Sequence, residues 1–191
     1  MRTSGRGGVL ELRGACVALS APSAGDEREF VELRRASRAF LAPWEASGGD
    51  HDPFGPERFQ RFLARRGSSQ RFVLRRCQDG ALVGALSLTR IEPVARSAQL
   101  GFWLGEAHTR RGYMSEALAL VERWAAAERG LAVLEAQVLP ENSASRALLG
   151  KLGYRREATT TPLVRAVAGR EREHELWLRY LPQHYLPHSR G

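Results

Sequence analysis

The sequence predicts a mixed α/β fold of the α+β type, in which helices flank a mostly antiparallel sheet. Two observations carry this prediction. Strand-like segments lie on both sides of the Asp79-Gly80 dipeptide, which is typical of an antiparallel hairpin. Farther along, a helical pattern over 115–129 separates two strand patterns, and such a strand–helix–strand unit makes its two strands parallel. A sheet that contains both connections is mixed.

The composition indicates one ordinary globular domain. The apolar fraction of 43% and the charged fraction of 26% are those of soluble proteins, and 191 residues fit a usual domain size of roughly 100 to 200 residues. We expect a single domain over residues 1–191, with a frayed tail after Pro182. No run of about 18 apolar residues occurs, and the first residues lack the apolar core of a signal peptide. The expected location is therefore the cytoplasm.

The chain is strongly basic, with a net charge of +8 that comes almost entirely from arginine, since Lys151 is the single lysine. A basic surface attracts nucleic acid, the ribosome or a phosphorylated cofactor through its long-range field. Cys16 and Cys77 are far apart in sequence, with no second Cys or His near either one. This spacing excludes a disulfide framework and a zinc cluster, so we expect two core thiols and no metal.

The first half of the chain predicts a strand, two helices and the hairpin. Residues 15–23 have the pattern of a strand, and residues 26–41 that of a helix whose start has Asp26 and Glu29 in capping-box spacing. After a loop rich in Gly, Pro and Asp, a second helix is expected to end at Gly67.

The second half predicts the crossover unit and two further strands. Residues 97–105 alternate between two faces as a strand does, and Gly101 within them suggests a bulge or a close ligand. Helical spacing runs from Ser115 to a stop at Gly130. The remaining strands are expected at 132–139, 154–164 and 171–180.

The segment HTRRGYMSEAL, residues 108–118, places a turn between the alternating strand and the helix. A helix N-terminus presents free backbone N–H groups and the positive end of the helix dipole, which together bind anions. Gly112 allows a close backbone approach or a positive φ, while Arg110 and Arg111 add charge. The turn therefore suits a pyrophosphate. It lacks the glycine-rich fingerprints of phosphate loops and dinucleotide sites, so a plain surface turn is the alternative.

A second segment, VLPENSASRALLGKLGY, follows the next predicted strand. Together, GFWLGEAHTRRGYMSEAL and VLPENSASRALLGKLGYRRE resemble the acetyl-CoA-binding region of the GNAT superfamily of N-acetyltransferases. Within that superfamily the chain resembles the ribosomal-protein-alanine N-acetyltransferase group. FLAPWE and GREREHELWLRY are also similar to that group, so the resemblance covers nearly the whole chain.

The resemblance implies a GNAT-like sheet that splays open after the strand containing Leu100 to Leu104, with acetyl-CoA in the gap. It implies that residues 109–115 hold the pyrophosphate and that Asn142 hydrogen-bonds the pantetheine arm, although Asn142 also suits a helix N-cap. The residues carried over to the cofactor are Phe102, Trp103, Leu104, Thr109, Arg110, Arg111, Gly112, Tyr113, Met114, Ser115, Asn142 and Ser145.

The sequence departs from the family's pattern at three positions. Thr109 stands where an Arg or Gln usually opens the phosphate turn, and Leu149 where many members have a tyrosine as general acid. In the ribosomal group a serine earlier in that helix, here Ser145, would protonate the departing CoA thiolate or hydrogen-bond its sulfur. The alternative is a serine that satisfies a backbone donor.

The third departure bears on the acceptor. Gln99 replaces the usual carboxylate and cannot act as a base, which leaves water relayed to Glu92 or Glu135. An α-amine, with a pKa of about 8, is neutral at pH 7 a few hundredfold more often than a lysine side chain at about 10.4, so a base need supply roughly 3 kcal/mol less. The missing carboxylate therefore favours N-terminal amines.

The leading hypothesis is an enzyme that transfers acetyl from acetyl-CoA by direct attack of a primary amine, first of all the N-terminal α-amine of a ribosomal protein. Two alternatives stay open: an acetyltransferase for a polyamine, antibiotic or other small amine, and a basic module that binds ribosome or RNA without catalysis. The loop from Pro43 to Pro56 would shape the acceptor end. No membrane partner is expected, no nucleic-acid role is required, and monomer and homodimer both fit.

Other residues have a functional and a structural interpretation. Trp44 would wall the acceptor site or pin its loop to the core. His174, between two glutamates, would act as a base or lie on the surface. The arginines Arg34, Arg35 and Arg38 are expected on a solvated helix face.

Overall fold

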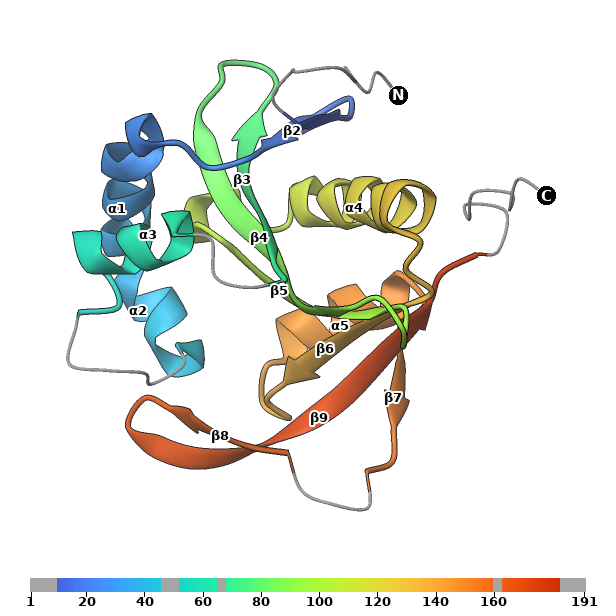
Figure 1. The fold of residues 1–191 in the computed structure, drawn as a ribbon. Helices are drawn as coiled ribbons and strands as arrows, with labels where there is room; N and C mark the ends of the chain where they lie inside the picture. Colours follow the sequence, from blue (N-terminus) through green and yellow to red (C-terminus); the bar gives the residue numbers. More distant parts are fainter. Residues whose placement is uncertain (1–9, 46–51, 65–67, 160–162, 183–191) are drawn as a thin grey trace.

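The computed structural model describes residues 10–45, 52–64, 68–159 and 163–182. Within them, the central sheet has the order β1-β2-β3-β4-β5-β6-β9-β7, and β8 pairs with β9 (Figure 1). The strands are β1 Glu11–Arg13, β2 Val17–Ser20, β3 Gln70–Arg76, β4 Leu82–Glu92, β5 Ser97–Leu104, β6 Val133–Val138, β7 Arg155–Glu157, β8 Leu163–Val167 and β9 Arg170–Tyr180. The helices are α1 Glu27–Ala36, α2 Arg38–Leu41, α3 Pro56–Leu63, α4 Tyr113–Arg129 and α5 Ser143–Lys151, with short 3-10 turns η1 Ala24–Asp26, η2 Ala42–Trp44 and η3 Glu106–His108.

The strand directions follow from the connections. The strands of the hairpin around Asp79 and Gly80, β3 and β4, are antiparallel, and so are all other neighbours except β5 and β6. β5 and β6 run parallel because α4 carries the chain back between them. These findings confirm the predicted mixed, mostly antiparallel sheet with flanking helices.

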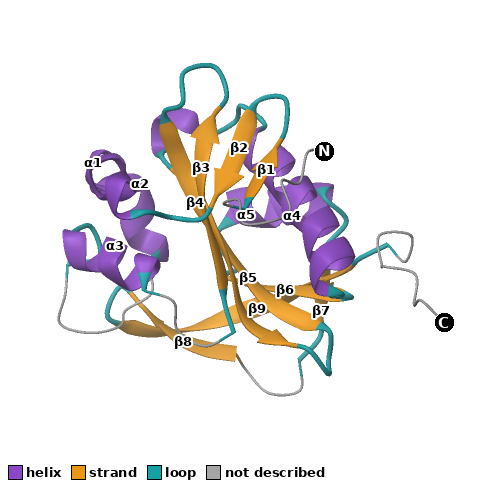
Figure 2. Ribbon diagram, turned by 45° about the horizontal axis from the view of Figure 1, so that its top comes forward, coloured by secondary structure: helices purple, strands orange, loops and turns teal. Residues whose placement is uncertain are grey.

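Helices cover both faces of the sheet (Figure 2). α4 packs on one face, where Leu118 belongs to the larger core. α1 and α3 pack on the other face, where Phe30 joins a smaller, aromatic core. Residues of β3 alternate between the two, since Phe72 and Leu74 belong to the larger core and Val73 to the smaller one.

The sheet opens between β5 and β6. Their register joins Ser97–Leu100 to Val133–Ala136 and ends there. From Gly101 onward β5 stays paired with β4, while the last residues of β6, Gln137 and Val138, stay paired with β9. The two halves of the sheet therefore diverge beyond Leu100, which is the splay that the family resemblance implied.

α4 starts at this opening and is anchored at its first turn. Its N-cap, Gly112, has a φ of +79°, a conformation that favours glycine. The Glu116 carboxylate accepts hydrogen bonds from the backbone N–H groups of Ala15 at 2.5 Å, Cys16 at 2.9 Å and Val17 at 3.1 Å. Glu116 thus ties the start of α4 to the turn between β1 and β2.

The helix predicted over 26–41 is divided. It breaks at Ser37 into α1 and α2, and the buried Ser37 hydroxyl accepts a hydrogen bond from the Glu106 N–H at 3.0 Å. The capping box lies three residues earlier than predicted, because the Ser23 N–H donates to the Asp26 carboxylate at 2.7 Å.

Two other local predictions were wrong, and one alternative for Gly101 is excluded. The segment predicted as one strand over 154–164 is two strands, β7 and β8, which both pair with β9. Gly101 makes no bulge, since it pairs with Ser87 in continuous register, but it lines the cavity described below, so the alternative of a close ligand stays open. The cysteines are not core thiols: Cys16 is exposed, and the Cys77 N–H donates to the Cys16 oxygen at 2.8 Å, so the two are neighbours in the fold.

Some expectations lie outside the described residues. These are the fraying after Pro182 and most of the loop from Pro43 to Pro56. The predicted end of the second helix at Gly67 was wrong, because α3 ends at Leu63 and its C-cap Ala64 is already extended. Among the described residues, no helix has both the length and the apolar character of a membrane span, and no group of three or more His, Cys, Asp or Glu side chains is placed to hold a metal ion.

Candidate active site

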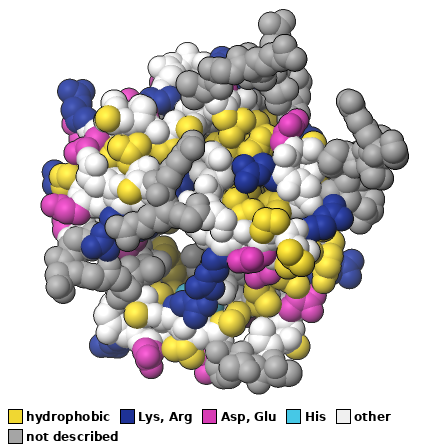
Figure 3. All heavy atoms as spheres, in the orientation of Figure 1, with side chains coloured by type: hydrophobic (Ala, Val, Ile, Leu, Met, Phe, Trp, Pro, Cys, Tyr) yellow, Lys and Arg dark blue, Asp and Glu magenta, His cyan; other side chains and the backbone are white. Residues whose placement is uncertain are grey.

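A cavity of about 1300 Å³ lies where β5 and β6 diverge. One end is lined by β5, the turn into α4 and the start of α5, and the other by α1, α2, η2 and α3. In the orientation of Figure 1, hydrophobic side chains reach the surface near the centre of the molecule beside Lys and Arg side chains (Figure 3). The predicted site residues that line the cavity are Phe102, Trp103, Leu104, Thr109, Arg110, Gly112, Tyr113, Met114, Ser115, Asn142 and Ser145.

The turn into α4 has the geometry of an anion site. Arg110 has a φ of +59° and Gly112 a φ of +79°, so the backbone enters the left-handed region twice before the helix. Such turns gather backbone N–H groups into a concave nest. The first intrahelical bond runs from the Glu116 N–H to the Gly112 oxygen at 3.0 Å, so the N–H groups through Ser115 have no partner within the helix. They belong to residues that line the cavity.

β5 offers backbone donors on the open side of the sheet. The Gly105 N–H donates to the Val83 oxygen, in β4, at 3.0 Å. The N–H groups of successive residues in a strand point to opposite sides. Those of Phe102 and Leu104 therefore point away from β4, into the opening where β6 is no longer paired with β5. These two groups are available to a ligand in the cavity.

α5 begins at the same cavity. The Asn142 side-chain oxygen accepts a hydrogen bond from the Ser145 N–H at 3.1 Å and so caps the helix. Capping leaves the two amide hydrogens of Asn142 as donors. The half-buried Ser145 lines the cavity, whereas Leu149, at the usual tyrosine position, is fully buried in the core.

Two predicted site residues do not line the cavity. Arg111 is exposed beside the turn and adds only nearby charge. Glu92 ends β4, and Ser87 is the β4 residue of the lining nearest to it in sequence, which places Glu92 about 16 Å farther along the strand. β4 runs away from the opening there, so the structure does not bring Glu92 to the cavity. His174, on β9, is also outside the lining, with its Nδ1 3.1 Å from the Arg172 oxygen.

Three charged side chains meet at the other end of the cavity. Glu45, directly after η2, is 13% exposed. Its Oε2 accepts a hydrogen bond from Arg34, and its Oε1 lies 3.2 Å from Nη2 of Arg58. Trp44 lines the cavity beside them.

Arg34 is buried, with only 1% of its side chain exposed, so the predicted solvated face was wrong at this position. Its Nε donates to the Pro53 oxygen at 3.1 Å, and its Cζ lies 4.8 Å from the centroid of the Trp103 ring. Burial lowers the pKa of Arg34, and the Glu45 carboxylate opposes that effect. A buried guanidinium stays charged and needs such a partner.

Sequence reasoning missed this charged end of the cavity. One signal for Arg34 was available, because it lies four residues after Phe30 and so shares the apolar face of α1. Glu45 belongs to the FLAPWE segment, whose similarity to the ribosomal group was noted without a role for the acid.

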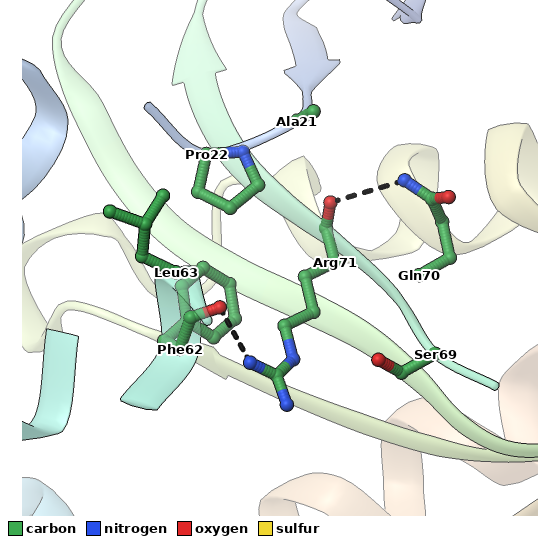
Figure 4. Close-up of a pocket in the computed structure, with 7 residues that line it drawn as sticks. All are labelled: Ala21, Pro22, Phe62, Leu63, Ser69, Gln70 and Arg71. Carbon is green, nitrogen blue, oxygen red and sulfur yellow. Dashed lines mark hydrogen bonds between the residues drawn. The ribbon is translucent and has the colours of Figure 1, made fainter. Parts of the chain in front are cut away.

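A second hollow, of about 40 Å³, is too small for a cofactor (Figure 4). Arg71 lies across it and donates to the backbone oxygens of Arg61 at 2.5 Å, Phe62 at 2.7 Å and Ala64 at 2.7 Å. These bonds satisfy the last carbonyls of α3, so Arg71 acts as a helix cap.

The chain matches the family model described as Acetyltransferase (GNAT) domain over residues 17–155. This range contains every element that lines the cavity. It ends before β8 and β9.

Individual acetyltransferases also resemble the chain, in sequence or in fold. The chain is 38% identical to the ribosomal-protein-serine acetyltransferase of Escherichia coli (strain K12) over 64 residues, which are 33% of this chain and 35% of that protein. The aligned segment thus spans about a third of that relative. A solved structure of Mycobacterium smegmatis RimJ in complex with CoA-disulfide has a TM-score of 0.78 and 28% identity, over 90% of this chain and 86% of that one. The fold also matches the ribosomal-protein-S5-alanine acetyltransferase from Vibrio fischeri, with a TM-score of 0.75 and 18% identity, over 93% of this chain and 100% of that one.

Proposed function

This chain belongs to the GNAT family of acetyltransferases, and we propose that it transfers an acetyl group from acetyl-CoA to the N-terminal α-amine of a protein in the cytoplasm, with ribosomal proteins as the first candidates. The observation that carries the proposal is the cavity at the opened sheet. It combines an anion-binding helix start, free backbone donors, and a far end where Glu45 meets two arginines. The similarity to ribosomal-protein acetyltransferases supports this choice of acceptor.

The cofactor end fits acetyl-CoA in polarity and charge. The N–H groups of residues 112–115 would hold the pyrophosphate, with Arg110 and Lys151, which also line the cavity, adding positive charge. The amide of Asn142 and the backbone of Leu104 would contact the neutral pantetheine arm. Acetyl-CoA supplies the activated acetyl group when it is bound.

Catalysis would depend on positioning. Direct transfer requires the amine and the thioester to be held in near-attack geometry, which a cavity open to both substrates provides. The free N–H of Phe102 or Leu104 would stabilise negative charge on the thioester oxygen. Ser145 would donate its hydroxyl proton, or a hydrogen bond, to the departing sulfur, since Leu149 has no polar group. The proton that the attacking amine loses would pass through water to Ser145 or to the thiolate, so that the products are the amide and the CoA thiol.

The end of the cavity that holds Glu45 favours an acceptor with one ammonium group over a polyamine. One carboxylate, Glu45, faces two guanidinium groups, those of Arg34 and Arg58, so these three side chains together carry a net positive charge. Glu106 is the other acid of the cavity lining. A polyamine would bring several positive charges to this end, whereas an N-terminus brings one. The low pKa of an α-amine also makes it the acceptor that needs a base least.

The test is intact-mass spectrometry of stripped ribosomal proteins incubated with the purified chain, with and without acetyl-CoA. We expect one protein to gain a single acetyl unit, and fragmentation to place it on the N-terminus. Release of CoA with small amines but no change in any ribosomal protein would move the acceptor to the small-amine class. No transfer to either, with salt-sensitive RNA binding, would point to a non-catalytic module.

A further inference from the structure

We propose that Glu45 binds the primary ammonium group of the acceptor, and that Arg58 occupies the same carboxylate oxygen until the acceptor displaces it. This inference rests on the proposed function and states how the acceptor would be recognised. The ligand class is a polypeptide N-terminus that carries one ammonium group, which would release one proton to solvent and attack the thioester as the neutral amine.

The backbone of Glu45 is fixed from two sides. Its N–H donates to the Ala42 oxygen at 3.3 Å, within η2, and its own oxygen accepts from the Ala168 N–H at 3.1 Å. Ala168, with a φ of +48°, and Gly169, with a φ of +78°, form the turn between β8 and β9. Two segments that are distant in sequence therefore hold this residue at the cavity.

The two guanidinium partners of Glu45 differ in how easily they can leave. Arg34 is 1% exposed and is also bonded to Pro53, so its departure would create an unpaired buried charge. Arg58 is 40% exposed and can turn into solvent, because an ion pair with an exposed partner contributes little to stability. Oε1 of Glu45, which faces Arg58, is therefore the exchangeable position.

An ammonium group suits the position that Arg58 would vacate. It brings the same charge as the guanidinium it replaces and three hydrogen-bond donors, so the balance around Arg34 and Glu45 is kept. Phe40 and Trp44 line the same end of the cavity and offer aromatic surface to the first side chain of the acceptor.

Steady-state kinetics with the tetrapeptide amide Ala-Ala-Ala-Ala-NH2, at saturating acetyl-CoA, test the exchange. Glu45→Gln is expected to raise the KM for the peptide at least about tenfold, with the affinity for acetyl-CoA unchanged. Arg58→Gln is expected to lower that KM about threefold, because the internal competitor is gone. The matched control is Arg38→Gln, which removes an exposed ion pair with Asp52 at 2.9 Å outside the lining and should leave the KM unchanged.

The direction of the change at Arg58 separates exchange from a structural role. A structural role predicts an unchanged or higher KM for Arg58→Gln, and either result would overturn the inference. A wild-type KM for Glu45→Gln would also overturn it. Because Glu45→Gln removes the charge that forms an ion pair with buried Arg34, the melting temperature of the Glu45→Gln variant is measured alongside. If that variant fails to fold, the result for Arg58→Gln decides. If the wild-type chain acetylates neither the peptide nor any ribosomal protein, the proposed function itself fails and the inference with it.

Discussion

The side-chain oxygen of Asn142 accepts a hydrogen bond from the Ser145 N–H at 3.1 Å, at the edge of the proposed acetyl-CoA cavity. One residue thus caps α5 with its oxygen and keeps its amide hydrogens for a ligand. The two roles use different atoms of the same side chain, so substitutions can separate them.

Asn142→Asp keeps the capping oxygen and loses the amide donor, whereas Asn142→Ala loses both. We expect the Ala variant to unfold about 1 kcal/mol more easily and the Asp variant to keep near wild-type stability. Calorimetric titration should show weaker binding of acetyl-CoA, by about tenfold, for both variants. Equal affinity in the Asp variant and the wild type would reduce Asn142 to a helix cap.

The two glycines that flank α4 provide a matched pair. Gly112 has a φ of +79° and Gly130 a φ of +64°, and a Cβ at either would meet no atom within 4 Å. An alanine at each position therefore costs similar backbone strain, roughly 1 kcal/mol. Only Gly112→Ala should weaken acetyl-CoA binding, by about tenfold in a calorimetric titration, because only Gly112 belongs to the phosphate turn. An equal loss for Gly130→Ala would place the effect in helix stability.

The anchor of α4 can be tested with a double-mutant cycle. A Cβ at Gly14 would clash with Oε1 of Glu116, so Gly14→Ala must displace the carboxylate that binds three backbone N–H groups. We expect each single variant, Gly14→Ala and Glu116→Ala, to lose about 2 kcal/mol in urea unfolding. The double variant should lose clearly less than the sum, since both changes remove one contact. Additive losses would show that the two residues act separately.

The buried carboxyl group of Glu122, on α4, should make the stability of the protein depend on pH. Burial raises its pKa above 4.5, although Arg179, with Nε 3.4 Å from its Oε2, opposes this. The folded state therefore binds this proton more tightly than the unfolded state does. The resulting contribution to the free energy of unfolding decreases as the pH rises from the ordinary pKa of the carboxyl group through its raised pKa. Urea unfolding should show Glu122→Gln gaining on the wild type between pH 4 and pH 8. Glu128→Gln, exposed on the same helix, is the control, and the same trend in it would refute the assignment.

Features with a local signal could be predicted from the sequence. Gly112 and Gly130 bracket α4, and Asp79-Gly80 specifies the hairpin, because a positive φ demands particular residues. The opening of the sheet came from the family resemblance instead. In the structure it follows from register, since β5 changes from two neighbours to one beyond Leu100.

What could not be predicted depends on partners far apart in sequence. The helical spacing places Arg34 on the apolar face of α1, but only the fold brings its partners Glu45 and Trp103 to it. α1 ends at Ser37 beside the N–H of Glu106, 69 residues later, which no local pattern indicates. The distance of Glu92 from the cavity could not be predicted either, because a strand pattern does not show which end of β4 reaches the cavity.

The most direct test of the account is a crystal structure of the protein with bound acetyl-CoA. We predict the pyrophosphate on the N–H groups of residues 112–115, the pantetheine arm between Leu104 and Asn142, and the thioester facing the end of the cavity that holds Glu45. A cofactor bound elsewhere, or with its phosphates away from the turn into α4, would contradict the central claim.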